Sequence, residues 1–258
     1  MKMKNNIDYA DFYERVGRTN GWNFSSINVV SEKIGWNFYE EVVRHTRSSD
    51  LLLDIGTGGG EAVLSIAEEA LLLVGIDLAQ GMIETAQQNL LAAEAHSAGT
   101  HSNVRFLHMG AEKLYFPDCF FNVVSSRHSG FSASEVFRVL AQGGIFLTQQ
   151  VSEHDKSNLS EAFGRGQSLG IQPGTLMERY KHELQIAGFH DIQVREYNVV
   201  EHYTTPEDLM FLLTHAPIIP DFGKVETDVE RFQKFVREHY EEKGIRTNSA
   251  RFMITARK

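Results

Sequence analysis

The residues best placed to do chemistry lie in a glycine-rich turn, LLLDIGTGGGE, which spans Leu51 to Glu61. Gly56, Gly58 and the two glycines that follow fall within five positions. Glycine permits the positive φ angles of a sharp turn and lets a ligand approach the backbone closely. Because Glu61 to Ala70 has a helix-forming composition, we expect the loop to present free backbone N–H groups at a helix N-terminus. The pattern predicts a binding site for a nucleotide-type ligand.

The residues around this loop indicate which nucleotide is bound. In a dinucleotide fingerprint the third glycine would stand where this chain has Glu61, and a glutamate beside a pyrophosphate is electrostatically unfavourable. The loop lacks the G-K-[ST] of a P-loop, which excludes a triphosphate site of that kind at this position. Asp54, just before the loop, suits an ammonium or a zwitterion better than a phosphate. We therefore expect a ligand that is cationic in part.

A second acid, Asp77, ends the apolar run VGID about twenty residues after the loop. An acid at the carboxyl end of this strand in a doubly wound fold commonly binds the hydroxyls of a ribose. Asp77 could also cap the helix that begins near Gly81, and the two roles are compatible. We expect the ribose role for Asp77.

These residues need a frame, and the chain supplies the pattern of one from Leu51 onward. Short apolar runs alternate with helical stretches, as in a parallel sheet covered by helices on both faces. The predicted strands are Leu51 to Ile55, Leu72 to Asp77, Val104 to His108, Phe121 to Ser125 and Ile145 to Gln150. The predicted helices between them are Glu61 to Ala70, Gly81 to Ala95 and Ser134 to Leu140.

The second half of the chain continues the alternation and adds an insertion. We predict a helix over Thr175 to Ala187, a strand over Ile192 to Tyr203, a helix that starts at Pro206, a helix over Val225 to Glu242 and a last strand from Arg251. The helical insertion at about 204–246 is expected to form a cap. Residues 1–48 are expected to form an N-terminal helical lid or substrate region, and residues 49–258 a doubly wound, Rossmann-like α/β domain.

The composition narrows the class of protein. The chain has 258 residues and a net charge of -9, which opposes a general nucleic-acid-binding role because such binding depends on clustered Lys and Arg. Its single cysteine, Cys119, excludes an intrachain disulfide and is expected to be a small core residue. The N-terminus has no apolar core of a secretory signal, and no apolar run is long enough to span a bilayer. We expect a cytoplasmic protein.

Four segments taken in order resemble the motif series of class I S-adenosylmethionine-dependent methyltransferases. They are LLLDIGTGGGE, VGIDLAQGMIETAQ, AEKLYFPDCFFNVVSSRHS and EVFRVLAQGGIF, which together cover roughly Leu51 to Gln150. The ordered series is far more specific than any one motif. The resemblance implies a mostly parallel seven-stranded sheet with an antiparallel last strand. It also implies S-adenosyl-L-methionine as cofactor and S-adenosyl-L-homocysteine as its product.

The resemblance also implies roles for individual residues. Asp54 and the turn of Gly56, Thr57 and Gly58 would hold the methionine part of the cofactor, and Asp77 the ribose. The remaining contacts would be Leu78 against the adenine, Gly110, Ala111 and Glu112 near its edge, and Arg127 beside the sulfonium. The chain departs from the family pattern where Gly110 replaces an adenine-facing aspartate, so the adenine amino group would bond to Glu112 or to backbone. Asn122 and Gln142 are further departures.

Methyl transfer from a sulfonium is an in-line displacement, so alignment and exclusion of water are the main tasks and a base is optional. His128 is the candidate general base, because it follows the fourth strand and histidine titrates near neutral pH. A structural role for His128 is at least as consistent with the sequence. The other histidines show no close metal-ligand spacing, so we predict no metal.

We predict a small-molecule acceptor, bound by segments outside the motif series. The candidates are the N-terminal aromatics (Tyr9, Phe12, Tyr13, Trp22, Phe24, Trp36) and the late insertion with His202, Tyr203, Phe211 and His215. Two alternatives remain open at this point. One is an RNA base methyltransferase, which the acidic composition opposes. The other is a non-catalytic S-adenosylmethionine-binding regulatory module, which the fold by itself does not exclude.

Overall fold

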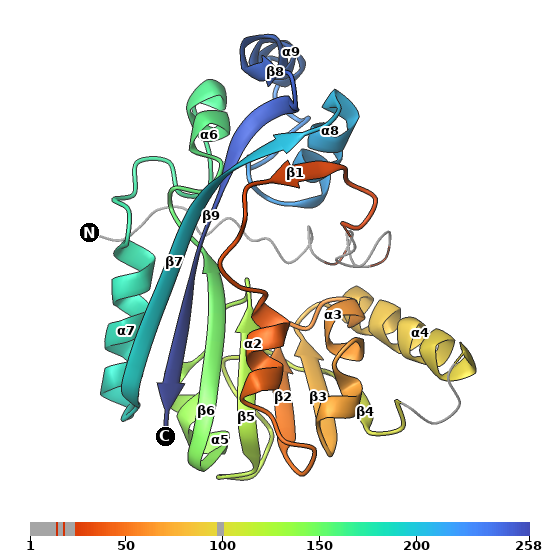
Figure 1. The fold of residues 1–258 in the computed structure, drawn as a ribbon, viewed down its shortest axis with the longest axis vertical. Helices are drawn as coiled ribbons and strands as arrows, with labels where there is room; N and C mark the ends of the chain where they lie inside the picture. The colour runs from red at the N-terminus through yellow and green to blue at the C-terminus, as the bar shows by residue number, and fades with distance from the viewer. Residues whose placement is uncertain (1–13, 15–17, 19–23, 97–100) are drawn as a thin grey trace.

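One twisted sheet organises the chain. The computed structural model describes residues 14, 18, 24–96 and 101–258. Its sheet has nine strands in the order β1-β7-β9-β6-β5-β2-β3-β4, with β8 paired to β9 (Figure 1). The central strands are β2 (Leu51–Ile55), β3 (Leu72–Asp77), β4 (Val104–His108), β5 (Phe121–Arg127) and β6 (Leu140–Val151), all parallel. The doubly wound frame predicted from the sequence is confirmed.

The antiparallel part of the sheet lies on one side of β6. β9 (Gly244–Arg257) pairs antiparallel with β6 and with β7 (His190–Tyr203), so the last strand is antiparallel as expected, and it lies between these two strands. These account for the seven predicted strands. Two short strands, β1 (Val29–Ser31) and β8 (Tyr240–Glu241), were not predicted. A strand of two or three residues is too short to show the alternation of apolar and polar side chains by which strands are recognised in a sequence.

Helices cover both faces because β2 and its neighbours carry apolar side chains on both. Leu52 packs with α2 (Phe38–Arg44) and α4 (Gln80–His96), whereas Leu53 packs against α5 (Ala133–Val139) and α7 (Thr175–Ala187) on the opposite face. Successive residues of a strand point to opposite faces, so a strand buried on both faces reads as a continuous apolar run. This run is what the sequence shows just before the glycine loop.

The predicted helix over Glu61 to Ala70 is shorter than expected. It forms as α3 (Glu61–Leu64), followed by the single turn of 3-10 helix η1 (Ala67–Glu69). Asn103 explains the break, because its side-chain amide donates to the carbonyls of both Ala67 and Ala70. Those carbonyls are therefore satisfied without further α-helical turns, and the chain can enter β3 directly.

The long strands β7 and β9 carry a separate upper part of the molecule (Figure 1). It contains α6 (Ser157–Phe163), α8 (Pro206–His215), α9 (Asp228–His239) and β8, of which all but α6 lie between β7 and β9. Of these elements, α8, α9 and β8 fall within the range of about 204–246 for which an insertion was predicted, and α6 lies outside it. Phe163, Leu209 and Phe235 belong to the upper part's own apolar cluster, which is distinct from the two clusters that flank the sheet.

The predictions for the N-terminal region can be compared with the structure only from Phe24 onward, apart from Glu14 and Arg18. Tyr9, Phe12, Tyr13 and Trp22 lie outside the described residues. The described part is not wholly helical, since β1 pairs antiparallel with the end of β7 before α2 begins.

The expectation that Cys119 is a core residue is wrong. Its thiol is exposed in the turn before β5, where the backbone takes a φ of +54°. The sulfur lies 3.5 Å from the Lys258 ammonium.

Candidate functional site

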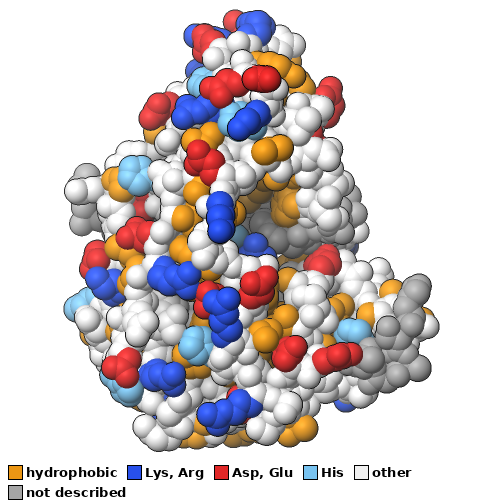
Figure 2. Space-filling view, viewed as in Figure 1, with side chains coloured by type: hydrophobic (Ala, Val, Ile, Leu, Met, Phe, Trp, Pro, Cys, Tyr) orange, Lys and Arg blue, Asp and Glu red, His pale blue; other side chains and the backbone are white. Residues whose placement is uncertain are grey.

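A cavity of about 1460 Å³ lies at the carboxyl ends of the parallel strands, between the sheet and the upper part of the molecule. Figure 2 shows the surface hollowed at this level. Pockets for single small ligands usually measure about 300–1000 Å³. The cavity is therefore large enough for two ligands at once.

The glycine loop forms part of the cavity wall and is bonded to the end of β3. The backbone N–H groups of Gly56 and Thr57 both donate to the carbonyl of Ile76, and that of Gly58 donates to the Asp77 carboxylate at 3.0 Å. The expectation of a row of free N–H groups is thus wrong for these three residues. A loop that uses its donors internally is a poor cradle for a pyrophosphate, which agrees with the ligand class inferred from the sequence.

Gly56 is the position where the loop most needs a glycine. Its φ is +73°, and a Cβ added there would lie 2.2 Å from the Cβ of Ser129. At Thr57, the next residue, the side chain matters rather than the backbone. The residue lines the cavity, but its hydroxyl oxygen is buried and lies toward β3, where a Cβ on Gly75 would be 2.7 Å from it. Burial raises the pKa of the Asp54 carboxyl, and this hydroxyl opposes the rise.

Asp77 lines the cavity at the end of β3, as predicted. One carboxylate oxygen accepts from Gly58 N–H and the other from Ala79 N–H at 2.9 Å, directly before α4. Burial raises the pKa of this carboxyl above its usual value, while these hydrogen bonds oppose the rise. Asp77 therefore connects the loop, the strand and the helix start, and its outer lone pairs face the cavity.

Asp54 is placed differently from the sequence expectation. It is fully buried and does not line the cavity. Its carboxylate accepts a 2.6 Å hydrogen bond from the Ser125 hydroxyl and a 3.5 Å one from the Tyr39 hydroxyl. Burial raises the pKa of Asp54 to about 6. The guanidinium of Arg127, 5.7 Å from the Tyr39 ring centre, does line the cavity.

The residues expected around an adenine come together beside the loop. Leu78, Ala111 and Glu112 line the cavity, and the Leu78 side chain is largely exposed there. Gly110 lies between Leu78 and Glu112, since a Cβ on it would be 2.7 Å from the Glu112 carboxylate. Position 110 therefore leaves room for the longer acid at position 112.

His128 lines the same cavity directly after β5. Its backbone φ is +57°, an uncommon conformation for a residue other than glycine. Burial is the largest cause that lowers the pKa of its imidazole well below the usual value, and the nearby Arg251 and Arg127 guanidinium groups lower it further. The ring is therefore neutral at physiological pH.

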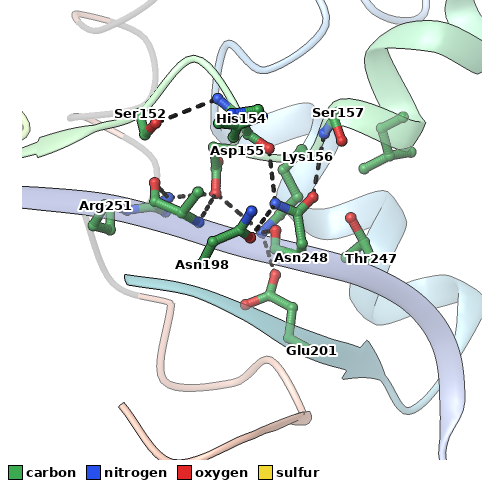
Figure 3. Close-up of polar contacts among 12 residues, drawn as sticks. Ser152, His154, Asp155, Lys156, Ser157, Asn198, Glu201, Thr247, Asn248 and Arg251 are labelled. Atoms are coloured by element: carbon green, nitrogen blue, oxygen red, sulfur yellow. Dashed lines mark hydrogen bonds and ion pairs between the residues drawn. The ribbon is translucent and has the colours of Figure 1, made fainter. Parts of the chain in front are cut away.

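The far end of the cavity is a buried cluster of charges that the sequence did not predict (Figure 3). We call it the charged cluster and define it as Asp155, Lys156, Glu201, Tyr203 and Arg251, all of which line the cavity. The Lys156 ammonium pairs with the Glu201 carboxylate, and the Arg251 guanidinium pairs with Asp155. The Tyr203 hydroxyl donates to Glu201 at 2.9 Å. The two cations and two carboxylates balance.

Three separate segments build this cluster. Asp155 and Lys156 precede α6, Glu201 and Tyr203 end β7, and Arg251 lies on β9. Only Tyr203 had been singled out from the sequence. The other expected late-insertion residues do not line the cavity: His202 pairs with Glu241 at 2.9 Å, and Phe211 stacks on His215.

Among the residues that the structure describes, no group of three or more His, Cys, Asp and Glu side chains is arranged to bind a metal. No described helix is both long and apolar enough to cross a bilayer.

Known proteins with similar sequences are methyltransferases. A family model described as a methyltransferase domain matches residues 52–144. The uncharacterised methyltransferase YcgJ of Bacillus subtilis is 34% identical over 108 residues, which cover 39% of this chain and 40% of that protein. The ubiquinone/menaquinone biosynthesis C-methyltransferase UbiE of Stutzerimonas stutzeri is 28% identical over 142 residues, covering 50% and 52%. The chain thus spans about half or less of the length of these curated relatives.

Solved structures extend the likeness of fold to nearly the whole chain. The crystal structure of YcgJ matches with a TM-score of 0.55 and 21% identity, covering 86% of this chain and 97% of that one. A functionally unknown protein of Deinococcus radiodurans matches with a TM-score of 0.62 and 15% identity, covering 96% and 99%. The fold, the glycine loop and the match of residues 52–144 to a methyltransferase domain agree, and together they support a class I S-adenosylmethionine-dependent methyltransferase.

Proposed function

We propose that this protein binds S-adenosyl-L-methionine and transfers its methyl group to a small-molecule acceptor. The observation that carries the proposal is a single cavity with two differently built ends. One end consists of the family's cofactor motifs. The other is the charged cluster, built by segments outside those motifs.

The residues at the first end fit this cofactor. Asp77 lines the cavity and offers carboxylate lone pairs to a ribose diol. Leu78 gives an apolar surface for the adenine, with Gly110, Ala111 and Glu112 at its edge. Gly56 and Gly58 let the ligand approach the backbone, and Arg127 also lines the cavity. The bound cofactor would supply an electrophilic methyl group on a positively charged sulfur.

Asp54 would act on the cofactor indirectly. It is buried directly before the loop in the chain, and its negative charge favours an ammonium group in the cavity near Tyr39. Tyr39 lines the cavity, whereas Asp54 does not. We therefore propose Asp54 as a residue that sets the charge of this end of the site.

The chain's own contribution to methyl transfer is alignment and exclusion of water. The displacement requires the acceptor atom, the methyl carbon and the sulfur in one line. Phe131 and Tyr180, with Leu212 and Ile218 of the upper part, line the cavity with largely apolar side chains that would keep water from that line. The charged cluster would orient the acceptor through its polar groups. 

Two observations favour a small acceptor over RNA. The polar far end of the cavity lies among buried residues such as Glu201 and Lys156, and the net charge of -9 opposes contact with a phosphate backbone. The UbiE relative, by its name, methylates carbon in quinone biosynthesis, which supports an acceptor of small-molecule size.

The test compares the two ends of the cavity with one variant each. Calorimetry measures binding of S-adenosylhomocysteine, and transfer of labelled methyl from S-adenosylmethionine is followed across a panel of phenols, amines, carboxylates and total RNA.

Tyr203→Phe removes one hydroxyl of the charged cluster. We expect it to leave cofactor affinity unchanged while raising KM for the acceptor. Asp77→Asn should weaken cofactor binding.

Three outcomes would contradict the proposal. Absence of binding by both cofactor forms removes its basis. Tight binding without transfer to any acceptor supports a regulatory module. Salt-sensitive RNA binding with RNA methylation supports the nucleic-acid alternative.

A further inference from the structure

A line of three side chains runs from the outer side of β6 to the cavity. The Trp36 indole nitrogen lies 2.8 Å from the Gln149 amide oxygen, and the Gln149 amide nitrogen lies 3.1 Å from Nε2 of His128. Trp36 and Gln149 border a second, open groove behind α2, whereas His128 lines the main cavity. Gln149 is 5% exposed, so its amide depends on these partners.

The chemistry of the three groups fixes the direction of both hydrogen bonds. An indole N–H can only donate, so the amide oxygen of Gln149 must face Trp36. The amide NH₂ then faces His128, and an amide NH₂ can only donate. Nε2 of His128 must therefore accept with its lone pair, and a neutral imidazole that accepts at Nε2 carries its proton on Nδ1.

The surroundings keep this state. Arg251 and Arg127 are the charged groups that act on the imidazole among the described residues, and both disfavour a second proton on it. The backbone N–H of His128 donates to the Gln149 carbonyl at 2.8 Å, which holds the two residues side by side. Nδ1 has no hydrogen-bond partner among the described residues, although the ring lines the cavity.

We propose that Trp36 and Gln149 are positioning residues that hold His128 as the neutral Nδ1–H tautomer, so that His128 donates a hydrogen bond to the acceptor. This rests on the proposed function. The only lone pair of the ring is occupied by Gln149, so His128 is not a base for the acceptor. The acceptor atom that meets it must have a lone pair, as a hydroxyl, enolate or carbonyl oxygen does. A protonated amine does not fit at that point.

The test is nitrogen NMR of the full chain labelled with ¹⁵N-histidine and saturated with S-adenosylhomocysteine. The two ring nitrogens of a neutral imidazole give distinct signals, and His128→Gln identifies those of His128. We expect a protonated Nδ1 and an unprotonated Nε2, unchanged across the range in which an ordinary histidine titrates. Gln149→Glu presents a carboxylate that only accepts, so Nε2 should become protonated.

Gln142→Glu is the matched control, since it makes the same change at an exposed position of the same strand. It should leave the His128 signals unaltered. Trp36→Phe frees the amide to turn over and should give a mixture of tautomers. An Nε2–H tautomer in the wild type, or identical spectra for wild type and Gln149→Glu, would overturn the proposal. The predicted spectra with no methyl transfer would instead leave the tautomer assignment standing and count against the proposed function.

Discussion

At the scale of single residues, the site combines two acids with different surroundings. Asp77 faces the cavity while its two oxygens hold the loop and the start of α4. Asp54 lies beneath the same loop, is fully buried, and has the Ser125 and Tyr39 hydroxyls as partners. Asp77 is thus arranged to bind a ligand directly. Asp54 places a negative charge where no water solvates it, which costs stability when it ionises.

Asp54→Asn should stabilise the protein in a pH-dependent way. The folded-state pKa is raised from 3.8 to about 6, so the folded protein holds a proton that the unfolded chain has lost, and wild-type stability falls as pH rises between these values. Relative to wild type, the variant should gain about 3 kcal/mol from about pH 4 to pH 7. Urea unfolding at several pH values measures this gain. Glu226→Gln, at an exposed side chain, is the control, and a gain that does not grow with pH would count against the assignment.

Asp77→Asn should weaken S-adenosylhomocysteine binding by about tenfold to a hundredfold, the usual effect of losing hydrogen bonds to a charged group. The amide keeps one acceptor oxygen, so one of the two hydrogen bonds from the backbone N–H groups of Gly58 and Ala79 is lost as well, and the fold of the variant must be checked. Calorimetry gives the affinity, and circular dichroism checks the fold. Undiminished affinity in a folded variant would exclude Asp77 as a cofactor ligand.

At the scale of elements, the start of α8 connects the upper part to the sheet. Thr205 and Asp208 form a reciprocal capping box, and Asp208 also accepts from the backbone N–H of Asn28, just before β1. The hydrogen bonds from Thr205 and Asn28 lower the pKa of the Asp208 carboxyl despite its burial. One helix start therefore holds the N-terminal strand and the insertion together, beside the cavity.

Thr205→Ala should lower the free energy of unfolding by about 1 kcal/mol, because it removes the hydroxyl that caps Asp208 N–H. The neighbouring Thr204 has an exposed side chain, so Thr204→Ala is a matched control with an expected change within about 0.5 kcal/mol. Urea denaturation compares the three proteins. Equal stability of the two variants would show that the capping box contributes nothing.

At the scale of the whole molecule, the cavity exists because two parts of the chain face each other across it. The sheet contributes the carboxyl ends of its parallel strands, and β7 and β9 extend beyond the sheet to carry the insertion (Figure 1). Ligands of doubly wound folds bind at such strand ends. Residues of both parts line this cavity, so a bound cofactor should stabilise the molecule as a unit.

S-adenosylhomocysteine at about 100 times its Kd should raise the melting temperature by about 5–10 °C, since binding to the folded state alone adds about 2.7 kcal/mol. NAD⁺ and ATP at equal concentration should produce no rise, because Gly56, Thr57 and Gly58 spend their N–H groups within the fold. Differential scanning fluorimetry makes the comparison. An equal rise with NAD⁺ would contradict the ligand class proposed here.

The order of strands and helices over residues 51–151 follows closely from the sequence, because each strand is a short apolar run between turn residues. The positions of the glycine loop and of Asp77 were also predictable, because each directly follows or ends a predicted strand. The two strands, β2 and β3, are neighbours in the sheet, where Asp54 pairs with Gly75.

The amino-acid sequence by itself determined the α/β frame, which depends on local periodicity and turn chemistry, and it showed the resemblance of the motif series to a known family. Only the tertiary structure decided that Asp54 lies beneath the cavity wall, that Gln149 occupies Nε2 of His128, and that Lys156 meets Glu201. Lys156 and Glu201 are 45 positions apart, and no periodic pattern links them. Such contacts form because the pairing of strands far apart in the chain brings these segments together. A local pattern in the sequence does not encode pairing over that range.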